Sequence, residues 1–254
     1  MGRRGRARRW RRAGGRPRVW AHRGASAVAT ENTLEAFAAA PRAAGADGGV
    51  ELDVQLCRGG DVVVFHDDDL QRLAGRPERV ADLPLAELRA TALRGGGTWC
   101  TLAEALEAAG PLEVNVEIKS TGPGRAGALP AAAVAVIRAA GAAAAERVLV
   151  SSFDPWALVQ VRRAAPELAT ALLFHAGEPL PARRGWIGPW VGAAALHPEH
   201  VLCSGATVAA WRRAGFAVNV WTVDDPVRLR ELAAWGVDGL FCNDPGAALA
   251  ALGG

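Results

Sequence analysis

Acidic side chains alternate with apolar ones in two short segments of the sequence. Glu51 and Asp53 stand two residues apart in the run VELDV, and Glu117 and Lys119 stand two residues apart in VEIK. Side chains with this spacing point to the same face of a β-strand. Three carboxylates gathered from neighbouring strands offer the oxygen ligands that Mg²⁺ and Ca²⁺ prefer. We therefore predict that Glu51, Asp53 and Glu117 bind a divalent cation.

Two histidines follow apolar runs, His22 after VWA and His66 after VVVF. A pair of imidazoles can exchange protons near neutral pH, and Arg23 and Lys119 can neutralise phosphate oxygens. Together with a cation site, this set is typical of phosphoryl chemistry. A lone histidine or a lone pair of acids is more often structural, but uncompensated carboxylates in a protein core are costly. The whole set is therefore better explained by a functional site.

Two more residues bear on substrate binding. Lys119 is the single lysine in a chain that has 28 arginines. Arginine replaces lysine well on a solvated surface but not where a compact ammonium fits a tight site, so we interpret Lys119 as a site residue. Trp221 ends the run VNVW. It either packs in the core or forms a wall against the substrate, and the sequence leaves both interpretations open.

These residues lie at the ends of apolar runs that alternate with segments of helical spacing. This βα alternation predicts a parallel sheet, and about eight steps match a closed TIM (β/α)8 barrel, with a doubly wound open sheet as the alternative. Residues 58–97 interrupt the rhythm, and we interpret them as a small insertion after the second strand. The expected strands are residues 18–21, 49–56, 62–65, 112–118, 148–151, 169–174, 193–196, 217–221 and 239–242. The expected helices are residues 33–44, 101–109, 131–140, 155–165, 205–214, 226–235 and 245–252.

The first 18 residues differ sharply from the remainder. They hold nine arginines and no acid, whereas the remaining chain has 20 basic and 26 acidic side chains. We expect residues 1–18 to be a disordered basic tail and residues 19–254 to be one domain. The acidic body argues against a nucleic-acid-binding surface.

Several features indicate a cytoplasmic protein. No apolar segment of signal-peptide length follows the basic residues, and the longest apolar stretch, residues 126–145, is interrupted and rich in alanine. We therefore expect no transmembrane segment. The four cysteines show neither close pairing nor metal-finger spacing, which favours free thiols in a reducing compartment. Nothing in the sequence indicates an oligomeric state.

In this order, the motifs resemble those of the glycerophosphodiester phosphodiesterase family over about residues 19–250. The matching stretches are AHRGA at 21–25, ENT at 31–33, ELDV at 51–54, FHD at 65–67 and EIK at 117–119. Weaker matches are SSF at 151–153, VWTVD at 220–224 and GVDG at 236–239. Two places depart from the family pattern: Cys100 stands where proline is common, and CNDP at 242–245 differs from the usual end of the last strand.

The resemblance implies a TIM barrel with a small insertion that hydrolyses small-molecule glycerophosphodiesters to sn-glycerol 3-phosphate and an alcohol, with Mg²⁺ or Ca²⁺. It implies metal ligation by Glu51, Asp53 and Glu117, acid–base catalysis by His22 and His66, and phosphate binding by Arg23 and Lys119. A lysophospholipase D-like relative, or another phosphodiesterase of the superfamily, would use the same groups but needs an apolar groove, which the insertion's few large apolar side chains do not favour. A non-catalytic binding barrel is the alternative from another class, and the intact set of seven residues argues against it.

Overall fold

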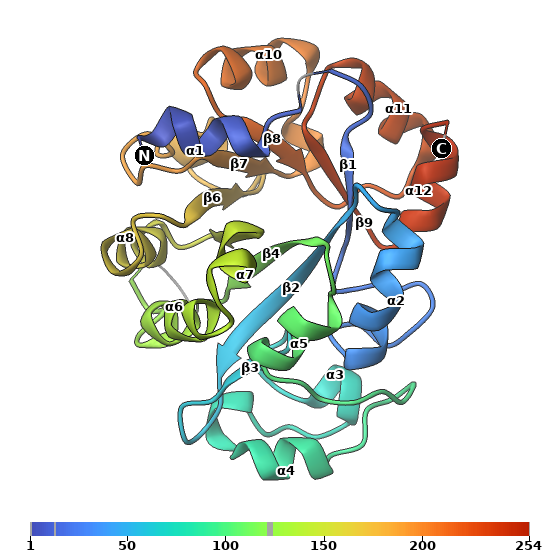
Figure 1. Cartoon of the computed structure of the whole chain (residues 1–254), viewed down its shortest axis with the longest axis vertical. Helices are drawn as coiled ribbons and strands as arrows, with labels where there is room; N and C mark the ends of the chain where they lie inside the picture. Colours follow the sequence, from blue (N-terminus) through green and yellow to red (C-terminus); the bar gives the residue numbers. More distant parts are fainter. Residues whose placement is uncertain (1, 13, 121–123, 254) are drawn as a thin grey trace.

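The computed structural model describes residues 2–12, 14–120 and 124–253. Within these residues, eight parallel strands form a closed barrel (Figure 1). The ring closes because β1 pairs with β9 on one side and with β2 on the other. The barrel strands are β1 (Arg18–Ala21), β2 (Gly49–Leu56), β4 (Glu113–Ile118), β5 (Val148–Ser152), β6 (Ala169–Phe174), β7 (Ala195–Pro198), β8 (Ala217–Val220) and β9 (Gly239–Cys242). The predicted barrel is confirmed, and the open sheet is excluded.

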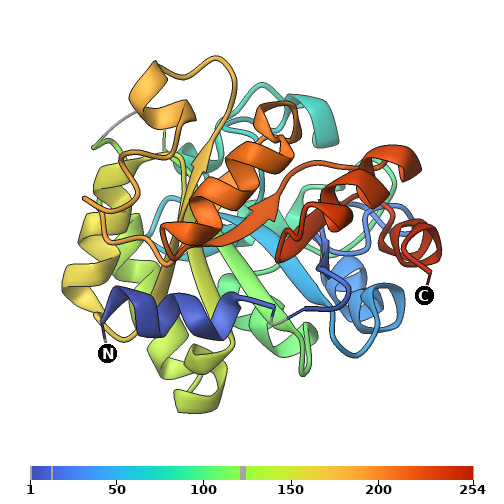
Figure 2. The same cartoon turned by 90° about the horizontal axis from the view of Figure 1, so that it is seen from above.

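Helices pack around the barrel between successive strands (Figures 1 and 2). The larger ones are α2 (Leu34–Ala44), α5 (Leu102–Ala108), α6 (Leu129–Ala139), α8 (Pro155–Ala164), α10 (Gly205–Arg213), α11 (Pro226–Ala234) and α12 (Pro245–Ala251), and the short ones are α7 (Ala142–Glu146) and α9 (Leu180–Arg183). Six helices begin at a side chain that accepts a hydrogen bond from a backbone N–H of the first turn, namely Thr33, Thr101, Asp154, Ser204, Asp225 and Asp244. These caps satisfy N–H groups that have no partner within the helix and explain why the helices begin there.

The segment between β2 and α5 adds no strand to the ring. It holds β3 (Val62–Val64), α3 (Gln71–Ala74), the 3₁₀ turn Val80–Asp82 and α4 (Leu85–Ala90). β3 pairs antiparallel with the end of β2. The segment has a small core of its own, in which the rings of Phe65 and Trp99 stack with centroids 4.7 Å apart. This core holds the residues that follow β3 at the rim of the barrel.

Large and small side chains share the barrel interior. Trp20 of β1 and Phe241 of β9 stack with ring centroids 5.5 Å apart and are surrounded by alanines of β6, β7 and β8. A Cβ atom at Gly49 would lie 2.3 Å from the Trp20 ring, and one at Gly239 would lie 2.4 Å from it. The two glycines next to Trp20 therefore leave room for the indole.

The expectation of a disordered tail over residues 1–18 is wrong, because residues Arg3–Trp10 form helix α1 and Arg18 begins β1. Figure 2 shows this helix (dark blue) alongside the ends of the barrel strands. Ala7 and Trp10, three residues apart on one helix face, are fully buried, and Trp10 stacks on Trp20. The sequence prediction did not foresee this packing. The small alanine side chains of the barrel interior leave the ring of Trp20 accessible to Trp10.

The arginines of this N-terminal segment have partners where the barrel strands begin. Arg9 pairs with Glu113 at 3.3 Å, and the backbone N–H of Arg12 donates to Asp238 Oδ1 at 2.7 Å. Glu113 opens β4, and Asp238 directly precedes β9. α1 thus covers the end of the barrel opposite to the carboxyl ends of the strands.

No helix among the described residues is long and apolar enough to cross a lipid bilayer.

Candidate active site

A pocket of about 160 Å³ lies at the carboxyl ends of the barrel strands. In TIM barrels this end holds the active site. Its lining comprises His22, Arg23, Glu51, His66, Asn115, Glu117, Lys119, Phe153, Leu173, Trp221, Thr222 and Phe241. Seven of the eight predicted site residues thus line one pocket. The eighth, Asp53, forms ion pairs with two of them, Lys119 and Arg23.

The three acidic residues form one cluster. Asp53 of β2 pairs in register with Glu117 of β4, and Glu51 lies two residues earlier on β2. One carboxylate oxygen from each lies within 4.8 Å of the others, and Glu51 and Asp53 are buried. Among the described residues, Oε1 of Glu51 has no hydrogen-bond partner. Oxygen ligands at this spacing, with a buried oxygen left over, fit a hard divalent cation.

The charges of the cluster are unevenly balanced. Burial, together with the charges of Asp53 and Glu117, raises the pKa of Glu51 well above its ordinary value. Burial also raises the pKa of Glu117, although Lys119 opposes this. Asp53 is equally buried, yet Lys119 and Arg23 hold its pKa far below the usual range. The protein's own cations therefore compensate Asp53 but leave the cluster short of positive charge, which a bound cation would supply.

Two basic residues border the carboxylates. Lys119 Nζ lies 2.9 Å from Glu117 Oε1 and 3.3 Å from Asp53 Oδ1. Arg23 Nε lies 3.5 Å from Asp53 Oδ2, and the Arg23 backbone N–H donates to Glu51 Oε2 at 2.8 Å. Arg23 has a φ of 59°, in the left-handed region that non-glycine residues seldom adopt. Such strain is concentrated at functional sites, and here it accompanies the turn that brings both the backbone and the side chain of Arg23 to the cluster.

His22 follows β1 and is held by a residue that the sequence prediction did not select. Its Nδ1 lies 2.8 Å from Oδ1 of Asn243, whose Nδ2 donates to Asp224 at 2.6 Å. Because that donation fixes the amide orientation, Nδ1 of His22 carries the proton, and Nε2, 3.9 Å from Glu51, is the basic nitrogen. Burial and the charge of Arg23 lower the pKa of His22. The neutral, proton-accepting form is therefore favoured.

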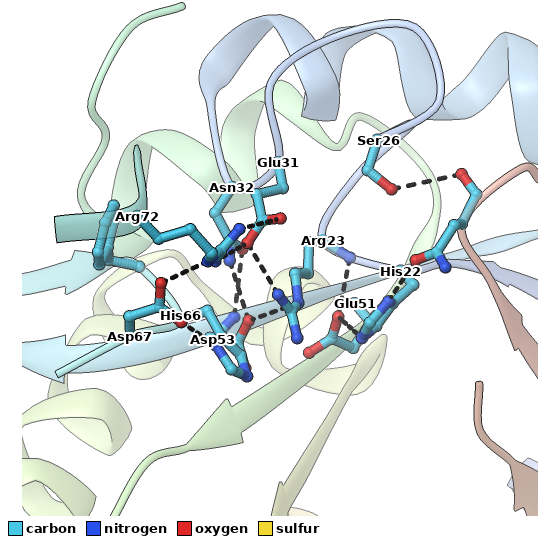
Figure 3. Close-up of polar contacts among 12 residues, drawn as sticks. His22, Arg23, Ser26, Glu31, Asn32, Glu51, Asp53, His66, Asp67 and Arg72 are labelled. Carbon is cyan, nitrogen blue, oxygen red and sulfur yellow. Dashed lines mark hydrogen bonds and ion pairs between the residues drawn. The ribbon is translucent and has the colours of Figure 1, made fainter. Parts of the chain in front are cut away.

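His66 has a different partner. Its Nδ1 lies 2.6 Å from Asp67 Oδ1, and Asp67 Oδ2 accepts from Arg72 Nε at 2.6 Å. Arg72 also binds Glu31, which accepts from Arg23 NH1 at 2.8 Å, so this chain of ion pairs links Asp67 to Arg23 (Figure 3). Although burial opposes it, the bonds from Arg72 and His66 lower the pKa of Asp67. Asp67 therefore stays ionised beside the imidazole.

Two further side chains order the site. Asn32, also with a left-handed φ of 58°, donates to Asp53 Oδ2 at 2.9 Å (Figure 3). Gln55 Nε2 donates to the backbone carbonyls of Phe65 and Asp67, which flank His66. The ENT motif marked Asn32 in the sequence, whereas no sequence signal marked Gln55 or Arg72.

Trp221 stands in the apolar wall of the pocket. Its ring is only partly buried, lines the pocket and meets Phe153 edge to face with centroids 5.5 Å apart. Its Nε1 donates to the carbonyl of His197 at 2.7 Å. Trp221 therefore lines the pocket and also packs against the apolar cluster around Trp20 and Phe241.

The chain is similar to several known proteins. A model of the glycerophosphoryl diester phosphodiesterase family matches residues 22–247. A glycerophosphodiester phosphodiesterase of Caldanaerobacter subterraneus is 32% identical over 244 residues, covering 89% of this chain and 94% of that protein.

Two solved structures show the same fold. A phosphodiesterase of Oleispira antarctica, solved in complex with the product sn-glycerol 3-phosphate, is 28% identical with a TM-score of 0.78 and covers 94% of this chain and 98% of its own. A glycerophosphodiester phosphodiesterase of Thermotoga maritima is 28% identical with a TM-score of 0.74, covering 93% and 99%. The match to the family spans every residue of the predicted site, and the chain therefore belongs to the glycerophosphoryl diester phosphodiesterase family of phosphoric diester hydrolases.

Proposed function

We propose that the protein hydrolyses small glycerophosphodiesters to sn-glycerol 3-phosphate and an alcohol, with the aid of a divalent cation. The observation that carries the proposal is the convergence of three carboxylates, two histidines and two cationic side chains on one pocket. The family match supports the reaction class, and the Oleispira relative was solved with this product.

Glu51, Asp53 and Glu117 would hold Mg²⁺ or Ca²⁺. Such a cation, when bound, supplies positive charge that stabilises the negative charge developing on the phosphoryl oxygens. Lys119 and Arg23 stand on either side of Asp53, at 3.3 and 3.5 Å, and would neutralise the remaining phosphate charge. The substrate phosphate would therefore lie against β2 and β4.

The two histidines have surroundings suited to opposite roles. We assign His22 as the general base, because its pKa is lowered and Asn243 leaves Nε2 unprotonated. We assign His66 as the general acid, because the Asp67 carboxylate stabilises an imidazolium. His22 would accept the proton of the attacking hydroxyl, either of water or of the glycerol. Attack by the glycerol hydroxyl would form a cyclic glycerol phosphate, which water must then open to give sn-glycerol 3-phosphate. As the bond from phosphorus to the leaving oxygen breaks, His66 would donate its proton to that oxygen.

The proposal is tested by measuring sn-glycerol 3-phosphate release from glycerophosphocholine. Purified protein stripped of metal by a chelator should be inactive, and Mg²⁺ or Ca²⁺ should restore turnover. Glu117→Gln removes one carboxylate charge from the cluster, and the cation should not restore its turnover. In the control Glu167→Gln, which alters an exposed ion pair with Arg138, the cation should restore turnover fully. Full turnover after verified metal removal would refute the role of the cation.

A further inference from the structure

A second pocket, of about 400 Å³, lies beside the catalytic pocket, among the loops that follow β5 and β6. Phe153 and Leu173 line both pockets, so the two spaces share a wall. The second pocket is also lined by Trp156, Pro181 and Ile187. Its surface is therefore mainly aromatic and aliphatic, and it continues the apolar side of the catalytic pocket.

The buried carboxylate at this second pocket, that of Asp154, is already engaged within the protein. Asp154 accepts hydrogen bonds from Ser120 Oγ at 3.1 Å, from the Gly124 N–H at 2.8 Å and from the Trp156 N–H at 2.9 Å. The side chain of Glu178 is 26% exposed, and its carboxylate lies 3.7 Å from Nε2 of His175, beyond hydrogen-bond distance. Because the buried carboxylate of Asp154 has its partners, the pocket suits a hydrocarbon better than a polar group.

Large apolar side chains are exposed around this pocket. The Trp156 side chain lines it and is 59% exposed. Trp186, next to Ile187 in the chain, is 60% exposed. An exposed apolar surface that adjoins a catalytic site is a recognised mark of ligand binding. An apolar ligand covering Trp156 would remove that surface from water.

The arrangement of the catalytic pocket indicates which part of the substrate reaches the second pocket. Glycerol hydroxyls and phosphate oxygens need polar partners, and these stand on β1, β2 and β4. Phe153, Leu173 and Trp221 form the opposite, apolar side. On the basis of the proposed function, we infer that the second pocket binds the leaving alcohol and selects diesters whose alcohol is a hydrocarbon.

A pair of substrates of equal shape tests this inference. The sn-glycerol 3-phosphate ester of 3,3-dimethylbutanol is the neutral carbon counterpart of glycerophosphocholine. We expect its kcat/KM to be at least tenfold higher, because the pocket stabilises apolar groups. In the series from the ethyl to the hexyl ester, kcat/KM should rise roughly threefold to fourfold per methylene until the pocket is filled.

Variants locate the effect in the second pocket. Ala182→Trp, which fills the space, and Ile187→Asp, which adds a charge, should each flatten the rise with chain length. The matched control is Trp190→Ser, because Trp190 belongs to the same loop, is 88% exposed and does not line the pocket. The control should retain the full ratio between the hexyl and ethyl esters.

The outcomes separate this inference from the proposed function. Equal or better cleavage of glycerophosphocholine, or a flat series, would overturn the inference and leave the proposed function standing. Lysophosphatidylcholine carries its hydrocarbon chain on the glycerol, whereas the hexyl ester carries it on the alcohol. Faster cleavage of lysophosphatidylcholine would overturn the assignment of the pocket to the alcohol. No cleavage of any ester in the presence of metal would overturn both.

Discussion

Lys119 is the residue at which charge and shape can be separated most cleanly. Its ammonium lies 2.9 Å from Glu117 and 3.3 Å from Asp53 in a small pocket. Although burial disfavours the charge, these carboxylates raise the pKa of Lys119, so it is fully protonated at neutral pH. The role that we propose for it requires a compact point charge.

Lys119→Arg should therefore lower kcat/KM by more than threefold although the charge is kept. The planar guanidinium would bind the neighbouring carboxylates in a bidentate manner, and no N–H group would then be free to donate to the phosphate. The measurement is kcat/KM at saturating metal, with the exposed Arg163→Lys as the matched control. A loss of less than threefold in kcat/KM corresponds to less than about 0.65 kcal/mol of transition-state stabilisation. Such a small loss would show that charge alone matters at this position.

His66 and Asp67 form the other pair that can be tested at single residues. His66→Ala should reduce kcat by roughly 10² or more, the usual scale of general acid–base catalysis. Asp67→Asn should reduce it less, by roughly tenfold, because an amide can still accept a hydrogen bond from the ring but supplies no negative charge beside it.

The kcat is the informative measurement for Asp67→Asn, and the exposed neighbour Asp68→Asn serves as its control. An unchanged kcat in Asp67→Asn would mean that the carboxylate only orients the ring. Near wild-type turnover in His66→Ala would return His66 to a structural role.

Helix α1 shows what a single element adds. Trp10 is 2% exposed and stacks on Trp20 beneath the barrel interior, yet the helix contributes no residue to the lining of the catalytic pocket. It therefore acts on stability and not on chemistry.

Trp10→Ala should lower the free energy of unfolding by about 3 kcal/mol, the scale of a large-to-small substitution in a core. Urea unfolding measures this change, and Arg8→Ala on the exposed face of the helix is the control, expected within about 0.5 kcal/mol of the wild type. The kcat/KM of folded Trp10→Ala should match the wild type. A tenfold loss of kcat/KM would mean that packing at the end of the barrel covered by α1 also positions the site.

At the scale of the whole molecule, the acidic cluster couples metal binding to stability. Burial and mutual repulsion raise the pKa values of Glu51 and Glu117. A carboxyl group with a folded-state pKa above its unfolded value costs stability as pH rises through the folded pKa. The metal-free protein should thus lose stability on the alkaline side of the ordinary glutamate pKa of 4.5. A cation that needs the ionised carboxylates should offset this loss.

A divalent cation should therefore raise the melting temperature more at a pH of about 7.5 than at about 5.5. A concentration of about 10 mM Mg²⁺ or Ca²⁺ should roughly saturate such a site. Thermal unfolding with and without the cation measures the increase. Glu51→Gln should abolish the difference, and Glu178→Gln outside the cluster should keep it. Equal increases at both pH values in the wild-type protein would contradict the coupling.

Much of the architecture was readable from the order of residues. Seven of the eight barrel strands lie close to the predicted runs, because strands buried on both faces are rich in apolar residues, even where β2 and β4 also carry charged site residues. Only β7 is displaced: residues 193–196 were expected, whereas Ala195–Pro198 form the strand and include the buried His197. The charged residues at 51, 53, 117 and 119 could be assigned to one face because the two-residue period of a strand is a local property.

The contacts that orient these residues could not be read in this way. Asn243 holds His22 across 221 positions of the chain, and it lies in the stretch that departs from the family pattern. Arg72 joins Asp67 to Glu31 through a loop whose path no periodicity describes. Trp10 could be recognised as buried only once the alanine-lined interior and Trp20 were in place. Local patterns record which face of an element is apolar, whereas partners between loops depend on how the closed barrel brings distant segments together.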